Sequence, residues 1–143
     1  MCPSSAVRNW LIAAMVALGG AISSVGLAAY WQIFYFGLFL AAASWLAAAL
    51  VAMGFYVNAL NTFCSCAARH PSCRKTCADL GSTKFATIAA LWVAMGALLF
   101  ALGTGLHPAV FLVFAGGAGI AMFSMITALV SVVSELGICQ TVD

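Results

Sequence analysis

Six cysteines are the residues of this chain whose type and spacing point to chemistry. Four of them lie close together in the middle of the chain, at Cys64, Cys66, Cys73 and Cys77. Thiolates bind soft metal ions such as Zn²⁺ and Cu⁺, and they also hold iron–sulfur clusters. These four side chains are therefore candidate ligands of a thiolate-bound metal ion, and His70 between them is a candidate additional ligand.

The spacing of these cysteines leaves three other interpretations open. The pattern is C-x-C followed by C-x₃-C, whereas zinc sites commonly use a C-x₂-C pair. Cysteines beside a membrane are also sites of S-acylation, for which Cys64, Cys66, Cys139 and Cys2 are well placed. An oxidising compartment would allow structural or catalytic disulfides. Finally, cysteines also serve as small apolar residues without a shared role.

The composition excludes a water-soluble domain. Hydrophobic residues make up 66% of the 143 residues and charged residues only 6%, whereas about a quarter of a soluble protein is charged. The net charge of +2 is small, and basic residues form no stripe along the chain, so nucleic acid is not an expected partner. The expected surroundings are a lipid bilayer.

Two long runs of the chain contain no Asp, Glu, Lys or Arg, one between Arg8 and Arg69 and the other between Lys84 and Glu135. As one helix the first run would be about 90 Å long, roughly three times the ~30 Å hydrocarbon core of a bilayer. Each run must therefore turn back on itself. We predict an all-α integral membrane protein, a four-transmembrane-helix bundle built from two helical hairpins.

The predicted domain organisation is simple. Residues 1–143 form a single membrane domain, and its elements are helices at about 10–30, 33–62, 84–103 and 109–136 and a cysteine-rich loop at 63–83.

The basic residues predict which side of the membrane each end faces. They are Arg8, Arg69, Arg74, Lys75 and Lys84. Two helices separate the N-terminus from the central loop, so all five basic residues and both termini lie on the same side. The positive-inside rule makes this the cytoplasmic-type side of a plasma membrane, or the matrix or stromal side of an organellar inner membrane.

Small residues recur at helical spacing and predict close helix packing. Gly19 with Ser23 and Gly20 with Ser24 lie in the first helix, and Ala115 with Gly119 and Gly117 with Ala121 lie in the fourth. These pairs serve either an oligomer interface or packing within the bundle. Hydrogen bonds between helices are expected from Ser44, Thr87, Ser124 and Thr127.

The predicted helices contain no ionisable side chain at membrane depth, although proton relays and ion sites depend on such residues. No catalytic residue is predicted, and an enzyme is not expected. The favoured function is a non-catalytic accessory subunit or an oligomerising tetraspan scaffold, with copies of itself or other membrane subunits as partners. The alternative is a soft-metal transporter or sensor, or a membrane redox protein, using the central cysteines. A third possibility is an oligomeric channel.

Overall fold

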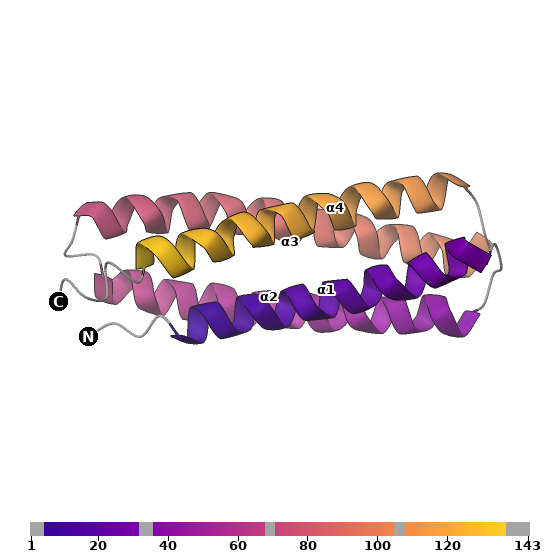
Figure 1. The fold of residues 1–143 in the computed structure, drawn as a ribbon, viewed down its shortest axis with the longest axis horizontal. Coiled ribbons are helices and arrows are strands. Elements are labelled where there is room, and N and C mark those ends of the chain that lie inside the picture. Colours follow the sequence, from indigo (N-terminus) through magenta and orange to yellow (C-terminus); the bar gives the residue numbers. More distant parts are fainter. Residues whose placement is uncertain (1–4, 32–35, 68–70, 105–107, 137–143) are drawn as a thin grey trace.

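In the computed structural model the chain forms four long α-helices that lie side by side (Figure 1). Residues 5–31, 36–67, 71–104 and 108–136 are described. The helices are α1 (Ser5–Trp31), α2 (Phe36–Ala67), α3 (Pro71–Thr104) and α4 (Pro108–Ser131), which a π-helical turn, η1 (Val132–Leu136), continues. Contacts are most extensive between α1 and α2 and between α3 and α4. The predicted all-helical fold of two hairpins is confirmed.

Each helix contains an apolar stretch long enough to cross a membrane. These stretches are Ala6–Ala28, Gly37–Ser65, Cys77–Gly103 and Pro108–Ser134. The shortest has 23 residues, which corresponds to about 35 Å of helix and exceeds a hydrocarbon core of ~30 Å. By length and composition the chain is a small multi-pass membrane protein.

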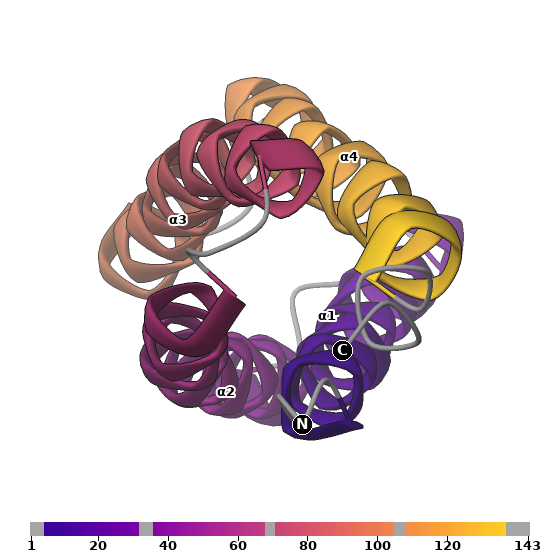
Figure 2. The ribbon, with the colours of Figure 1, turned by 90° about the vertical axis from the view of Figure 1, so that its left-hand side faces the viewer.

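Seen from the end, the helices form a ring in the order α1, α2, α3 and α4 (Figure 2). Each hairpin therefore meets the other hairpin along two seams. Of these seams, the one between α2 and α3 has the more extensive contacts, and the one between α1 and α4 has the less extensive contacts. The two hairpins are thus held together less tightly than the helices within each of them.

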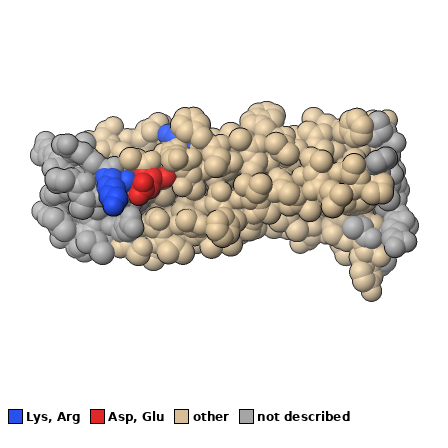
Figure 3. Space-filling view, turned by 90° about the horizontal axis from the view of Figure 1, so that it is seen from above, with Lys and Arg blue, Asp and Glu red and all other residues tan. Residues whose placement is uncertain are grey.

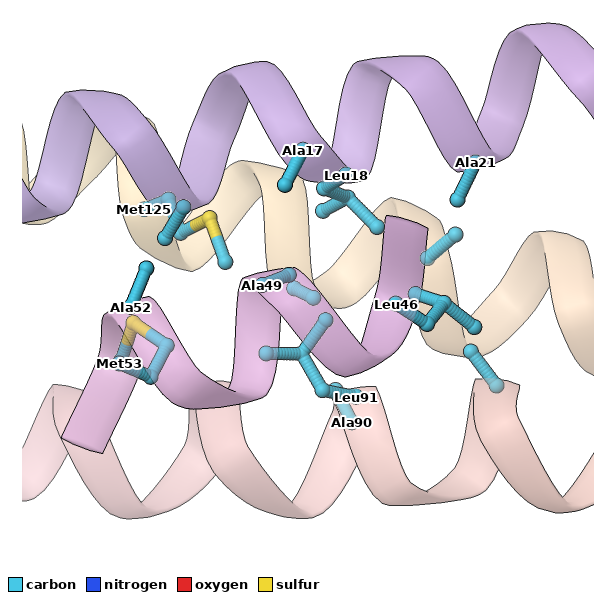
Figure 4. Packing of buried hydrophobic residues seen from close by; sticks show 14 of the residues in the cluster. Ala17, Leu18, Ala21, Leu46, Ala49, Ala52, Met53, Ala90, Leu91 and Met125 are labelled. Atoms are coloured by element: carbon cyan, nitrogen blue, oxygen red, sulfur yellow. The ribbon is translucent and has the colours of Figure 1, made fainter. Parts of the chain in front are cut away.

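Alanine and leucine side chains fill the interior of the bundle. The close view in Figure 4 shows Leu18, Leu46 and Leu91 packed among alanines and the thioethers of Met53 and Met125. Many large apolar side chains instead face outward, such as Leu112 and Phe123, which are 76% and 74% exposed. This outward face suits hydrocarbon and not water, because apolar surface in water is unfavourable.

Two glycines allow close contact within the hairpins. A Cβ atom at Gly20 of α1 would lie 2.6 Å from the indole ring of Trp45 of α2. A Cβ atom at Gly117 of α4 would lie 2.9 Å from the carbonyl oxygen of Ala90 and 3.0 Å from the backbone nitrogen of Ala94. The separations of 2.6 and 2.9 Å are shorter than real Cβ contacts, and that of 3.0 Å is tighter than most of them. Gly20 and Gly117 therefore serve packing within the bundle.

Three of the four hydroxyl groups that were expected to bond between helices bond within their own helix instead, which corrects the expectation for Ser44, Thr87 and Thr127; that for Ser124 stays a prediction. Ser44 donates to the carbonyl oxygen of Leu40 at 3.0 Å, Thr87 to that of Thr83 at 2.9 Å, and Thr127 to that of Phe123 at 2.9 Å. In each case the acceptor lies four residues earlier, where the helix itself offers a carbonyl oxygen within reach. Ser23 and Ser24 bond in the same way to Gly19 and Gly20.

The region predicted as a cysteine-rich loop at 63–83 is largely helical. α2 continues to Ala67, and α3 begins at Pro71. Proline suits the first position of a helix, because its missing N–H has no helical acceptor there. The segment after Pro71 contains Gly81 but no second proline, so nothing in it stops a helix. The polar character of this segment therefore marks the end of the apolar stretch and not the end of the helix.

Candidate functional site

The chemistry-bearing side chains gather where α2 ends and α3 begins, which we call the loop end. Cys64 lies in the last turn of α2, and Cys77 lies in the second turn of α3. Their sulfur atoms form a disulfide, with the two Cα atoms 6.0 Å apart. α2 and α3 run in opposite directions from the connection between them, so residues at similar distances from it face one another. The disulfide joins the two hairpins across the α2–α3 seam.

The surroundings of the disulfide are part apolar and part polar. Both cysteines are half-buried and pack against the hydrophobic core. Lys75 and Asp79 next to Cys77 are exposed, and the ammonium group of Lys84 lies 5.4 Å from the centre of the Phe85 ring. In Figure 3 the charged side chains on the visible face all lie towards the loop end, at the left. The disulfide therefore lies at the polar end of an otherwise apolar bundle.

The other predicted metal ligands are not placed together by the structure. The backbones of Cys66 and Cys73 belong to α2 and α3, but their side chains lie outside the described part of the chain, and so does His70. Among the residues that the structure describes, no three His, Cys, Asp or Glu side chains are grouped to hold a metal ion. The four-cysteine metal site stays a prediction. It requires the reduced chain, because a disulfide offers no thiolate ligands.

Cys2 and Cys139 also lie outside the described residues. Their acylation therefore stays a prediction as well.

Sequence reasoning missed one polar group inside the bundle. The side chain of Tyr56 is 1% exposed, and its hydroxyl group has no hydrogen-bond partner in the structure. The other buried polar side chain of the described core, Thr87, is satisfied by the carbonyl oxygen of Thr83. The available signal was that Tyr56 is the single tyrosine within a predicted helix away from its ends.

An apolar cleft of about 360 Å³ opens between α1 and α4. Its walls include Ile22, Val25 and Gly26 of α1 and Phe114, Ala118 and Gly119 of α4. A Cβ atom at Gly26 or at Gly119 would meet no other atom within 4 Å. This cleft follows the seam with the less extensive contacts, and its walls are almost entirely apolar.

Comparison with known proteins finds no matching family model, no similar curated protein and no similar solved structure. The interpretation of the site therefore depends on the residues of this chain alone.

Proposed function

We propose that this chain is a non-catalytic membrane subunit, either an accessory subunit of a larger assembly or a scaffold that oligomerises in the bilayer. The observation that carries the proposal is that some glycines of the chain pack against another helix of the bundle, whereas others are open to a helix from outside it. Gly20 and Gly117 pack within the hairpins, whereas Gly19, Gly26 and Gly119 have no neighbour within 4 Å of a Cβ position. Small residues on a lipid-facing surface let the backbone of another helix approach closely.

The proposed contact surface is the α1–α4 face around Gly26 and Gly119. These two glycines line the same cleft and are exposed, so a second helix would meet backbone there. Association in lipid depends on such close packing, because lipid tails are as apolar as the side chains that they would replace. The partner is a second copy or another membrane subunit.

The proposed orientation places the loop end on the cytoplasmic, matrix or stromal side of a plasma or organellar inner membrane. Arg8 in α1 and Lys75 and Lys84 in α3 support it, because these described basic side chains lie within or next to the loop-end parts of the apolar stretches Ala6–Ala28 and Cys77–Gly103. The positive-inside rule counts such lysines and arginines near the helix ends.

Replacing Gly26 or Gly119 by leucine tests the proposed contact surface. We expect the purified chain in mild detergent to run as a discrete oligomer or with a membrane partner, and either variant to reduce that species, because leucine would fill the space for the second helix. Native mass spectrometry measures the assembled fraction. Gly54→Leu is the matched control, because Gly54 of α2 is also exposed and free of neighbours. A wild-type chain that is monomeric in detergent and in bilayers would argue against a scaffold.

A second candidate function is favoured by the disulfide, namely a thiol-dependent redox protein or soft-metal protein. Its oxidised form would use the Cys64–Cys77 pair, and its reduced form would offer those thiolates, with Cys66 and Cys73, to a metal ion. Metal analysis of the reduced protein, purified without chelator, separates the candidates. Serine at all four positions would abolish metal binding or thiol exchange, whereas a scaffold would still assemble.

A further inference from the structure

We propose that Cys64 and Cys77 form a reversible redox latch between the two helical hairpins. The disulfide lies on the α2–α3 seam, and contacts across both seams are less extensive than those within each hairpin. The other seam, between α1 and α4, has the less extensive contacts and an apolar cleft of about 360 Å³. Opening the disulfide therefore removes a covalent link at the place where the hairpins are coupled.

Small thiols and disulfides in water can reach this pair. Both cysteines are half-buried and not enclosed. Lys75 and Asp79, beside Cys77, are exposed, and charged side chains keep water around them since their transfer into hydrocarbon is costly. Thiol–disulfide exchange needs such access by the attacking thiolate. Cys64 and Cys77 lie at the loop-end limits of the apolar stretches Gly37–Ser65 and Cys77–Gly103, where the hydrocarbon gives way to water.

The reaction is exchange with a low-molecular-weight disulfide, RSSR. A thiolate of one cysteine attacks RSSR, which forms a mixed disulfide and releases RS⁻. The thiolate of the second cysteine then attacks the protein sulfur of the mixed disulfide and releases a second RS⁻. The two protons lost by the cysteines end on two RSH molecules, and two electrons pass from the dithiol to RSSR. Reduction by two RSH molecules is the reverse reaction.

The compartment makes the latch reversible. This step rests on the orientation given under the proposed function, in which the loop end faces a reducing compartment. Stable disulfides are rare there, and those that form are usually transient and serve catalysis or redox sensing. The basic residues and the disulfide at the loop end are then consistent with each other. The cysteine pair is reduced in unstressed cells, and it forms the disulfide when the concentration of RSSR increases.

A chain whose only cysteines are Cys64 and Cys77, with serine at the other four positions, tests the latch in cells. Acid trapping followed by maleimide labelling counts its free thiols. We expect free thiols in unstressed cells, their loss after a brief pulse of a membrane-permeant disulfide, and their return after dithiothreitol. A disulfide that persists in unstressed cells, or thiols that never oxidise, would overturn the proposal. The matched control, with Cys77→Ser added, forms no intramolecular disulfide.

The same two-cysteine chain in bilayer nanodiscs allows the equilibrium between disulfide and dithiol to be measured, together with its effect on the ends of α2 and α3. The ratio of disulfide to dithiol should rise about tenfold for each tenfold rise in [RSSR]/[RSH]². Hydrogen exchange should show less protection of residues 58–67 and 71–84 in the reduced form and unchanged protection of residues 85–103. Equal protection of the first two segments in both forms would overturn the latch.

Labelling in sealed vesicles with an impermeant maleimide reports the side of the loop end. A loop end on the oxidising side would overturn the reversible latch, because the disulfide would then be permanent. That result would leave the scaffold in place if the oligomer is unchanged, so the two proposals fail separately.

Discussion

Gly117→Ala is expected to destabilise the bundle by about 1 to 3 kcal/mol, the usual cost of overpacking a close-packed contact. The added methyl group would lie 2.9 Å from the carbonyl oxygen of Ala90 and 3.0 Å from the backbone nitrogen of Ala94. Both are backbone atoms of α3, so relief requires α3 and α4 to move apart. Unfolding of the purified protein in mixed micelles of increasing denaturing-detergent content measures the change.

Gly116→Ala is the matched control for this prediction. Gly116 precedes Gly117 in α4, is exposed, and has no atom within 4 Å of a Cβ position. Alanine favours the helix over glycine by roughly 1 kcal/mol, so the control variant should equal or exceed the wild type in stability. Equal stability of the two alanine variants would show that α3 and α4 do not approach each other at Gly117.

Replacing Cys64 and Cys77 together by serine is expected to lower the stability of the oxidised protein by about 1 to 3 kcal/mol. A disulfide stabilises mainly by restricting the unfolded chain, with ~3 kcal/mol expected for a loop of about 15 residues, and this disulfide spans a sequence separation of 13. Helices that persist in the denaturing detergent already restrict the unfolded chain, so we expect the loss of stability to be smaller than ~3 kcal/mol. The measurement is the unfolding midpoint without reductant.

Reductant provides the internal control for this prediction. It should lower the midpoint of the wild-type protein to that of the double variant and leave the double variant itself unchanged. The prediction would be contradicted if reductant left the unfolding midpoint of the wild-type protein unchanged while mass spectrometry showed free thiols at Cys64 and Cys77. The disulfide would then add no stability between α2 and α3.

The number and pairing of the helices followed from the sequence because they depend on few physical quantities. The bilayer fixes the length of a helix that crosses it, and a charge-free run of roughly two to three times that length must turn back. The predicted ends of the helices were less accurate, because the polarity of the sequence shows where the lipid ends and not where the backbone hydrogen bonds of a helix end. α2 extends to Ala67, and α3 begins at Pro71. A helix can form at these positions whether water or lipid surrounds it.

The sequence pointed to the cysteines around the α2–α3 connection, but it did not choose among their possible chemistries. The cysteine spacing fitted metal binding, acylation and disulfides equally well. The Cys64–Cys77 pairing depends on α2 and α3 continuing as facing helices, and that continuation was missed. Similarly, the sequence showed small residues at helical spacing but not which of them, such as Gly117 or Gly119, face another helix. That division depends on how far each helix is rotated about its axis, which the nearly uniform apolar surface of these helices does not reveal.

Single-cysteine labelling in a cysteine-free chain tests the central claim, a four-span bundle with its chemistry at one end. The probes are Ala6→Cys, Lys75→Cys and Ser134→Cys for the loop end, and Tyr30→Cys and Pro108→Cys for the opposite end. With an impermeant maleimide on sealed vesicles of known orientation, the first three should react from one side and the last two from the other. Reaction of Ala6→Cys or Ser134→Cys from the side opposite to Lys75→Cys would contradict the account.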